Sequence, residues 1–380
     1  NDNREPTYRR TVFTWQFPYD IIGKLNVFIK GVNNSTSLSA ADKDYLLGQA
    51  YAFRGFMYFQ LSMEFQHTYT YDKTLPAPPI YTDITTEGKP MSTQEEMYKL
   101  ILSDLTTAVN IASSARIDKS YFNKESAAAV LAQVHQVMGN WADASKYAKI
   151  AYGNNVATAL DASAYRNGFN DMNANKEWLF ASPQSEDQSA YYWTAPFAFI
   201  DHTTTSYYAT YINADFVSKF SNTDVRNIFV ASSTITNPAD FRRYTTRKFK
   251  FNFGSDVPLI RTAEMILIDA EALARTPGKE AEAHDLLYAL QKNRDVNAVK
   301  STNTGAALID EILLERRKEL YAENGVEWFD AKRLRKGITR TGNHRIFKNL
   351  SADDKRFFLK VPQSEIDANE SIDDTVNKDR

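Results

Sequence analysis

The sequence contains no cysteine. This absence excludes disulfide bridges, zinc sites built on thiolates and a cysteine nucleophile. The five histidines are scattered, so that no HExxH or other close histidine pair occurs, and a G-x-S-x-G nucleophile elbow is also missing. We therefore predict no catalytic residue, no metal ligand set and no cofactor, while a structural cation stays open.

Long apolar runs and an excess of one charge are missing as well. The richest apolar run, residues 127–132, is far shorter than the roughly 18 to 20 residues that a membrane helix needs. Lys and Arg number 45 against 47 Asp and Glu, which leaves a net charge of -2. This balance gives no reason to expect a nucleic acid or an anionic membrane surface as a partner.

Helical periodicity dominates both ends of the chain, because apolar residues recur there at spacings of three and four. Ser39 and Ser92 or Thr93 are suitable N-caps for two of these segments. The predicted helices cover residues 19–32, 39–66, 93–112, 258–274, 280–295, 306–323 and 327–335. With 380 residues and 43% hydrophobic content the chain buries a large core, and we predict an all-α, mainly helical fold.

A repeated pattern of small and apolar residues occurs twice. A glycine at the turn of a helical hairpin is followed by such residues five, nine and twelve places later, which is typical of tetratricopeptide repeats and of tight helical hairpins in general. The two copies are Gly139, Ala144, Ala148, Ala151 and Gly278, Ala283, Leu287, Leu290. The pattern predicts a tetratricopeptide-like scaffold of helical hairpins.

Two segments break the helical periodicity. Residues 68–90 hold four prolines and are predicted to be a long loop, and residues 153–256 are irregular. We predict one domain over residues 1–380, with a helical scaffold at 15–152 and 257–336. Residues 153–256 are then a variable, loop-rich segment, where we expect ligand binding because loops carried by a rigid scaffold commonly bear function.

The aromatic content is high, at 13% with 21 Tyr and 23 Phe. Flat exposed rings bind the apolar face of a sugar or a peptide side chain with little loss of side-chain entropy. Three successive aromatic residues in a polar context cannot all point inward, whereas we expect Phe197 and Phe199 to be buried. The candidate ligand-binding residues are Trp193, Tyr191, Tyr192, Tyr207 and Tyr208, with Tyr81 from the proline-rich loop.

Four glutamates recur every fourth residue at 311, 315, 319 and 323 and therefore line one helix face. Because Arg316, Arg317 and Lys318 interleave with them, we interpret this face as one that pairs with neighbouring helices. A cation site or a catalytic carboxylate pair is the alternative. The two acids of a glycosidase need no local spacing, so a glycan-degrading enzyme also stays open.

Four segments resemble, in order, the SusD/RagB-like family. Residues 50–61, AYAFRGFMYFQL, are similar to the family helix A-x-A-x-R-A-F-x-Y-F-x-L, and residues 259–272 are similar to L-x-R-Y-A-E … Y-A-E-A. Residues 315–333 closely resemble the signature E-R-R-x-E-L-x-x-E-G-x-R-W-F-D-L-x-R, with Asn324 inserted in its Glu-Gly corner. Residues 361–369 resemble the terminal I-P-x-x-E-I-x-x-N segment.

The resemblance implies a tetratricopeptide-like scaffold with a variable ligand-binding half. It also implies a lipidated cysteine and an early helical segment, neither of which the sequence shows, so we expect a trimmed or naturally short chain. The signature residues are implied to be structural. Arg54 lies on a helix that is apolar on nearly all sides and needs a carboxylate partner, for which Glu264, Glu271 or Glu315 are candidates.

The leading hypothesis is a non-enzymatic nutrient-binding protein that captures oligosaccharides or oligopeptides. The resemblance implies that it passes them to a SusC-like TonB-dependent transporter, that it lies at the cell surface on a Bacteroidetes-type outer membrane, and that only a lipid anchor contacts the membrane. The alternatives are a helical glycan-degrading enzyme and a tetratricopeptide-like scaffold that binds protein. The identity of the ligand stays open.

Overall fold

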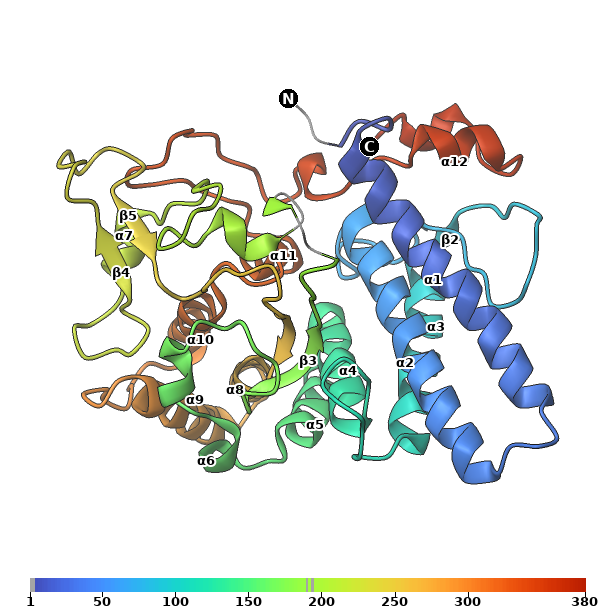
Figure 1. Ribbon diagram of the computed structural model, residues 1–380, viewed down its shortest axis with the longest axis horizontal. Coiled ribbons are helices and arrows are strands. Elements are labelled where there is room, and N and C mark those ends of the chain that lie inside the picture. Colours follow the sequence, from blue (N-terminus) through green and yellow to red (C-terminus); the bar gives the residue numbers. More distant parts are fainter. Residues whose placement is uncertain (1–3, 189–190, 193–194) are drawn as a thin grey trace.

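The computed structural model describes residues 4–188, 191–192 and 195–380. Helices α1 to α5 pack side by side in chain order, and α5 packs against α8, which in turn contacts α9 and α10. These helices form one scaffold, and the loop-rich segment lies beside it at the upper left of Figure 1. The scaffold helices are α1 (Arg9–Asn34), α2 (Ala40–Phe65), α3 (Gln94–Ile111), α4 (Lys124–Met138), α5 (Trp141–Tyr152), α8 (Thr262–Ala274), α9 (Glu280–Arg294), α10 (Gly305–Leu320) and α11 (Val326–Arg333). The prediction of a mainly helical fold is confirmed.

Local sequence explains several helix ends. Ser39 caps α2 by accepting a hydrogen bond from the Asp42 amide at 3.2 Å. At the start of α3, Thr93 and Glu96 form a reciprocal capping box, which satisfies two amides that have no partner inside the helix. Gly139 ends α4 in the left-handed conformation, with φ at +73°, where a side chain would be strained.

The two glycine-led repeats form the hairpins α4–α5 and α8–α9. Gly278 has φ at +76°, close to the value at Gly139, so both turns use the conformation that glycine allows best. The six small or apolar residues that follow the glycines are buried: Ala144, Ala148, Ala151, Ala283, Leu287 and Leu290. The repeat therefore marks the surfaces along which the hairpins pack.

Helix α1 begins ten residues before the predicted start at residue 19. Proline lacks an amide hydrogen and usually disfavours the helix interior. In the structure Pro18 lies inside α1 and is buried together with Trp15 and Ile22. The apolar stripe that packs against α2 thus continues through the proline, and its burial outweighs the local cost.

A short antiparallel strand pair replaces the start of the helix predicted at residues 258–274. Strand β6 (Val257–Arg261) pairs with β3 (Trp178–Ser182), and α8 begins only at Thr262. The residue before a proline favours extended backbone, so Pro258 holds Val257 outside a helix. Two further pairs join β1 (Pro76–Ala77) with β2 (Ser92–Thr93) and β4 (Phe229–Ala231) with β5 (Tyr244–Thr246).

The loop-rich segment has apolar clusters of its own. One contains Tyr165, Trp178, Phe197 and Phe249, and another packs Phe216 and its neighbours against Tyr321 of the scaffold. The short helices of this segment are α6 (Val156–Ala159), η1 (Ser163–Arg166), η3 (Pro196–Phe199) and α7 (Ala214–Val217). After the scaffold follow η4 (Lys355–Phe357), α12 (Gln363–Ala368) and η5 (Asp374–Asn377).

A buried charge network joins the loop-rich segment to the scaffold. Seven of its side chains, each at most 5% exposed, are Glu177, Arg226, Lys248, Arg261, Arg294, Glu319 and Glu323, and Arg226 extends it to Asp224 and Glu315. At its centre Glu319 of α10 accepts hydrogen bonds from Arg226 at 3.1 Å, from Arg261 at 3.0 Å and from Arg294 at 3.0 Å. Although burial alone raises the pKa of a carboxyl group, the three guanidinium groups hold the pKa of Glu319 well below its ordinary value.

The outer members of the network come from both parts of the chain. Glu177 accepts from Arg294 at 2.8 Å and from Arg261 at 3.2 Å. Lys248 lies 2.5 Å from Glu323 and donates to the carbonyl oxygen of Glu319 at 3.0 Å. The glutamate face thus pairs with its neighbours as interpreted, but two of its partners, Arg226 and Lys248, belong to the loop-rich segment and not to helices.

Arg54 has a different partner from those proposed. Its Nε and Nη2 donate to the two carboxylate oxygens of Asp104 at 2.7 and 2.8 Å, and its Nη1 donates to Asn26 at 2.9 Å. Asp104 lies on α3, which packs directly against α2. The expectation of Glu264, Glu271 or Glu315 was wrong because those carboxylates pair with Arg316, Arg333 and Arg226.

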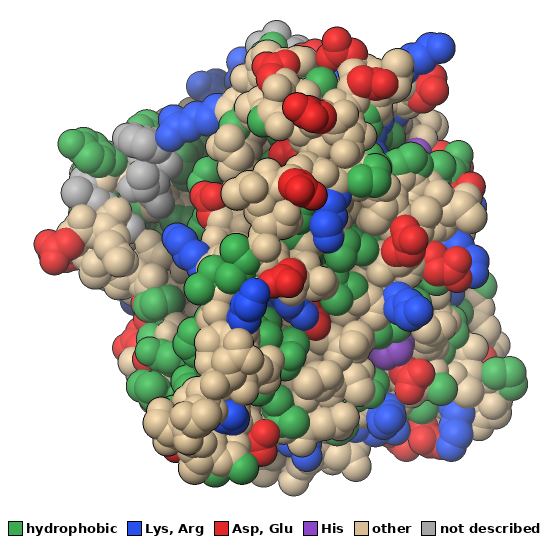
Figure 2. Space-filling model, turned by 90° about the vertical axis from the view of Figure 1, so that its right-hand side faces the viewer, with side chains coloured by type: hydrophobic (Ala, Val, Ile, Leu, Met, Phe, Trp, Pro, Cys, Tyr) green, Lys and Arg blue, Asp and Glu red, His purple; other side chains and the backbone are tan. Residues whose placement is uncertain are grey.

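The outer surface of α1 carries mixed side chains. Figure 2 shows this side of the molecule, where apolar groups and charges of both signs are interspersed. Phe13 and Phe17 of α1 are exposed and stack on each other, with ring centroids 5.4 Å apart. Within the described residues, no helix combines the length and apolar character needed to cross a membrane.

Candidate ligand-binding surface

Exposed aromatic side chains gather on the loop-rich segment. Phe199 stacks on Tyr207 with ring centroids 5.0 Å apart and an interplanar angle of 19°. The ring centroid of Tyr192 lies 6.1 Å from that of Tyr207 and 5.3 Å from that of Phe253. We call Tyr192, Phe199 and Tyr207 the aromatic platform. Their side chains are 37%, 37% and 47% exposed, so the rings remain accessible although they contact one another.

Backbone hydrogen bonds join the two chain segments that carry Phe199 and Tyr207. The Tyr207 amide donates to the Ala198 carbonyl at 2.9 Å, and the Thr210 amide donates to the Phe199 carbonyl at 2.8 Å. These bonds bring the residues on either side of the 200–206 turn into contact. The stacking of Phe199 on Tyr207 is therefore set by the backbone and does not depend on a ligand.

The turn itself is organised by the buried carboxylate of Asp201. It accepts hydrogen bonds from the hydroxyl and the amide of Thr203 at 2.6 and 2.7 Å, and from the amide of Phe251 at 2.8 Å. Burial raises the pKa of this carboxyl group, but these hydrogen bonds outweigh burial and lower the pKa below its ordinary value. Asp201 is therefore ionised at neutral pH, and its hydrogen bonds connect the turn to Phe251.

A second group of rings continues the surface. The ring of His202 lies 5.3 Å from that of Tyr208 and 4.9 Å from that of Tyr211, and Tyr211 meets Phe241 edge-on at 5.6 Å. The Nε2 atom of His202 lies 2.8 Å from the Thr210 carbonyl oxygen, so Nε2 carries the proton. Tyr208 is 41% exposed and has φ at +49°, an uncommon conformation for a tyrosine.

The predicted site residues are only partly brought together. Tyr192 and Tyr207 are in contact, Tyr208 lies next to Tyr207 in the chain, and Tyr191 is 65% exposed beside Tyr192. Trp193, the strongest candidate from the sequence, lies outside the described residues. Phe253, His202 and Tyr211 were not among the predicted site residues, and their proximity depends on turns that a local pattern does not reveal.

Tyr81 lies elsewhere, in the loop between β1 and β2 that Figure 1 shows on the opposite side from the loop-rich segment. Its carbonyl oxygen accepts hydrogen bonds from Tyr58 at 2.7 Å and from Asn26 at 3.0 Å. Its hydroxyl accepts from the Lys89 amide at 3.0 Å, and burial raises its pKa. These contacts attach the proline-rich loop to α1 and α2, and the structure does not bring Tyr81 near the platform.

The expectation for Phe197 and Phe199 was right for one residue and wrong for the other. Phe197 is buried and stacks on Phe249 at 4.6 Å, whereas Phe199 is exposed. Both belong to the 3-10 helix η3, in which each residue turns the chain by roughly 120°. Two residues two positions apart therefore face different directions, and only Phe197 reaches the interior.

The signature residues in the second half of the chain form ion pairs inside the scaffold. Arg316 donates to Glu264 and to Asp330, both at 2.9 Å, and Arg333 donates to Glu271 at 2.8 Å and to Asp330 at 2.7 Å. These pairs link α8, α10 and α11. In the part of the chain that the structure describes, no group of three or more acidic or histidine side chains is arranged to hold a metal ion.

The fold and this surface define a class of protein: a scaffold of helical hairpins that displays an aromatic surface on loops. A family model described as the SusD family matches residues 143–376, and a model described as "Starch-binding associating with outer membrane" matches residues 1–136. Because the first match covers more than half of the chain, the chain belongs to the SusD family.

Solved structures support this assignment. A SusD-like carbohydrate binding protein from Bacteroides vulgatus ATCC 8482 is 25% identical, with a TM-score of 0.85 over 95% of this chain and 83% of that chain. A SusD superfamily protein from Bacteroides thetaiotaomicron VPI-5482 is also 25% identical, with a TM-score of 0.85 over 95% of this chain and 85% of that chain. A search of curated proteins finds no match.

Proposed function

We propose that this chain is a non-enzymatic binding protein that captures an oligosaccharide on the aromatic platform. The observation that carries the proposal is the stacked and exposed arrangement of Tyr192, Phe199 and Tyr207. Sugar rings present apolar C–H faces that pack on such flat rings, while tyrosine hydroxyls donate to sugar oxygens. The related protein from Bacteroides vulgatus is itself described as carbohydrate binding, which supports the same ligand class here.

The extent of the surface favours an oligomer as the ligand. Rings continue from the platform through Tyr208 and His202 to Tyr211 and Phe241, so more than one ligand unit can lie on aromatic side chains. An oligopeptide is the alternative ligand, because apolar peptide side chains also pack on tyrosine rings. We propose residues 153–256 as the ligand-binding segment and residues 15–152 and 257–336 as the scaffold that carries it.

We also propose that the bound oligosaccharide passes to a SusC-like TonB-dependent transporter in the outer membrane. The family description that associates the matched relatives with the outer membrane supports this location. In this proposal a lipid anchor holds the protein at the cell surface. Co-purification of the transporter with the tagged protein from detergent-solubilised outer membranes is the direct test, and recovery of the protein alone would contradict the partnership.

Incubation with a panel of polysaccharides and peptides separates the competing functions. Retention of a glycan without shorter products supports capture, shortened products support a glycan-degrading enzyme, and retention of peptides alone supports the oligopeptide alternative. A protein-binding scaffold would retain neither. The assay needs affinity electrophoresis for retention and chromatography of the supernatant for products.

Once a glycan is retained, Tyr207→Ala tests the site. Loss of one stacking ring removes about 1 to 3 kcal/mol of contact, which corresponds to a roughly five- to 150-fold weaker affinity by calorimetric titration. Tyr8→Ala is the matched control, because Tyr8 is 41% exposed and is the N-cap residue of α1, with no side-chain capping bond to lose. Parental affinity in a folded Tyr207→Ala protein would place the ligand elsewhere.

A further inference from the structure

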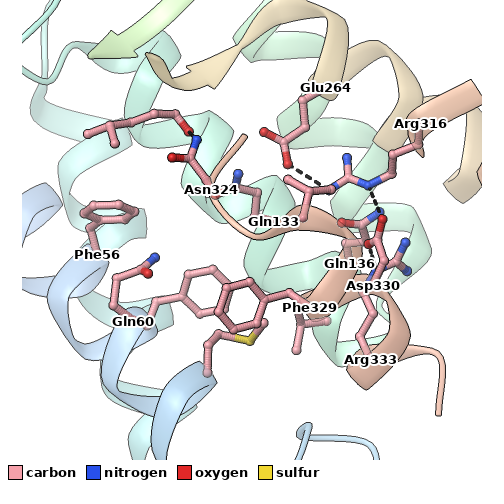
Figure 3. Close-up of a pocket in the computed structure, with 15 residues that line it drawn as sticks. Phe56, Gln60, Gln133, Gln136, Glu264, Arg316, Asn324, Phe329, Asp330 and Arg333 are labelled. Carbon is pink, nitrogen blue, oxygen red and sulfur yellow. Dashed lines mark hydrogen bonds and ion pairs between the residues drawn. The ribbon is translucent and has the colours of Figure 1, made fainter. Parts of the chain in front are cut away.

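A separate cavity of about 140 Å³ lies within the scaffold, between α2, α4, α8, α10 and α11 (Figure 3). Its deeper lining includes the buried side chains of Glu264 and Arg316, which are both 4% exposed. The half-buried side chains of Gln60 and Gln133 lie nearer the surface. The cavity therefore has a charged floor, an amide-bearing rim and access from solvent.

Several polar groups of this cavity lack partners. Arg316 uses Nη2 for Glu264 and Nε for Asp330, but its buried Nη1 has no hydrogen-bond partner among the described residues. The side-chain amides of Gln60 and Gln133 make no hydrogen bond to any described residue, although both line the cavity. A buried donor without a partner costs about 1 to 3 kcal/mol, so a ligand oxygen that accepts from Arg316 Nη1 offsets that cost, and the half-buried glutamine amides are free to bond to the same ligand.

Aromatic rings supply the apolar part of the lining. Phe56 from α2 and Phe329 from α11 border the same space as the two glutamines, and Figure 3 shows Phe56 and Gln60 side by side at one edge. The cavity thus offers apolar faces together with hydrogen-bonding groups. This combination suits a ligand that has a flat apolar face and several hydroxyl groups at its edge.

The charges of the lining side chains balance one another, so the cavity has no strong preference for an ionic ligand. The positive charges of Arg316 and Arg333 face the carboxylates of Glu264 and Asp330, so the four lining charges cancel. An anion would meet the two carboxylates and a cation the two guanidinium groups. A neutral ligand avoids both repulsions, and Arg316 Nη1 can still donate to its oxygen atoms.

The volume limits the size of the ligand. A protein cavity of about 150 Å³ accommodates a single benzene ring. The cavity here, at about 140 Å³, is of this size. A sugar unit is larger than benzene because its ring carries hydroxyl groups, so an extended oligomer cannot enter, and a single unit fits with some of its hydroxyl groups at the open rim.

We propose that this cavity is a second binding site, which takes one neutral hydroxylated six-membered ring with the chemistry of a single sugar unit. The unit is either a free monosaccharide or the terminal unit of a longer glycan. This site is independent of the aromatic platform, since it is built from scaffold helices and shares no residue with Tyr192, Phe199 or Tyr207. Its presence therefore does not rest on the function proposed above.

The test uses saturation-transfer NMR on the full chain with glucose, galactose, mannose and xylose, and with short oligosaccharides of the same units. The double variant Gln60→Met/Gln133→Met keeps the side-chain volume but removes both amides. Two lost hydrogen bonds should weaken binding by at least about fivefold. Gln16→Met, at an exposed position of α1, is the matched control and should bind like the parent.

Each outcome decides the proposal. Transfer to a monosaccharide that the double variant weakens supports a site for the free sugar, and transfer only to the ends of oligosaccharides supports a site for a terminal unit. Tyr207→Ala should leave either signal unchanged, which separates this site from the platform. No transfer to any of these sugars, or transfer that the folded double variant retains in full, overturns the proposal.

Discussion

Arg54 illustrates how one buried side chain fixes the contact between two helices. Its paired hydrogen bonds to Asp104 and its bond to Asn26 connect α2 with α3 and α1. Arg54→Ala leaves the Asp104 carboxylate buried without a counter-charge, and we expect a loss of about 3 to 5 kcal/mol in the free energy of unfolding. Urea denaturation measures this loss.

A surface pair provides the control for Arg54. Arg10 lies 3.6 Å from Glu64 and its side chain is 55% exposed, so Arg10→Ala should change the stability by less than about 1 kcal/mol. Equal stability of the Arg54→Ala and Arg10→Ala proteins would show that the buried pair does not hold the helices together.

Lys332 is a buried lysine whose charge opposes folding. Burial, only partly offset by Glu64, lowers its pKa from 10.5 to about 7. Between these two pH values the unfolded chain binds the proton and the folded protein does not, so Lys332 makes stability increase as the pH rises from about 7 towards 10.5.

The variant Lys332→Met removes this dependence. Below pH 7 both states of the parent carry the charge and the folded state bears its full burial cost, so the variant should be more stable there by on the order of 5 kcal/mol. The advantage should shrink as the pH approaches 10. Urea titrations at pH 6, 8 and 10 measure it, with the exposed Lys336→Met as control. A stability difference between the parent and Lys332→Met that does not change with pH would contradict the lowered pKa of Lys332.

Residue types were predictable from the sequence, but their partners were not. The need of Arg54 for a carboxylate follows from its apolar helix, yet Asp104 lies 50 residues away on a helix whose neighbour is set only by packing. Phe199 has the same hydrophobicity as Phe197, and the turn of η3 alone separates the exposed ring from the buried one. Long-range packing therefore limits prediction at this scale.

Among the helices, the contact between α2 and α3 depends on a glycine. A Cβ atom added at Gly55 would lie 2.8 Å from Cγ of Leu105, closer than real contacts allow. Alanine favours a helix over glycine by about 1 kcal/mol, but overpacking a core costs about 1 to 3 kcal/mol. We expect Gly55→Ala to lower the melting temperature.

Gly23 in α1 is the opposite case, since nothing lies within 4 Å of an added Cβ atom. Gly23→Ala should therefore stabilise the protein by about 0.5 to 1 kcal/mol through helix propensity alone. Calorimetry on both variants compares the two effects. A Gly55→Ala protein as stable as Gly23→Ala would mean that α3 moves away without cost.

The helices were more predictable than the strands. Helical periodicity extends over many residues, so seven helices were placed with errors confined to their ends. Strand β6 has five residues and runs directly into α8, and its partner β3 lies about 80 residues earlier, so the apolar run at 258–274 resembled a single helix. Short strands that pair with segments far away in the sequence leave no local hydrophobic periodicity to detect.

For the molecule as a whole, we expect the loop-rich segment to keep its shape only while the buried charge network is intact. Glu319→Gln leaves three arginines with one carboxylate fewer, and we expect a loss of about 3 to 5 kcal/mol in stability. Glycan affinity should fall as well, although Glu319 lies outside the platform. Hydrogen exchange should increase first in residues 195–253.

The same helix offers a control for Glu319. Glu311 accepts hydrogen bonds from Gln291 at 3.2 Å and from Asn303 at 2.8 Å at the edge of the scaffold, so Glu311→Gln should leave exchange in the loop-rich segment unchanged. The arginines lower the pKa of Glu319 in the folded protein below the value of about 4.3 in the unfolded chain. Glu319 therefore stabilises the fold fully above a pH of about 4.3, and this stabilisation is lost as the pH falls through the folded-state pKa. Equal hydrogen exchange in the Glu319→Gln and Glu311→Gln proteins would show that the charge network does not determine the shape of the loop-rich segment.

The scaffold was predictable as a whole because repeats and signature segments occur in order along the chain. For the candidate ligand surface, the sequence indicated residue types but not their arrangement. Tyr192 and Tyr207 were identified as aromatic residues in a polar context, but their contact requires the Asp201 turn, and the distant position of Tyr81 follows from its bonds to α1 and α2. The cavity beside Arg316 combines five helices and has no local sequence pattern.

The buried charge network also imposes an order on folding during synthesis. Glu177 bonds to Arg294, which is 117 residues later in the chain. At about 5 to 20 residues per second, a ribosome needs roughly 6 to 23 s to add that length. For this interval the nascent loop-rich segment exposes charged groups that have no partners and rings that have not yet packed, while α1 to α5 can already associate. We therefore expect the growing chain to depend on chaperones most between the synthesis of Glu177 and that of Arg294.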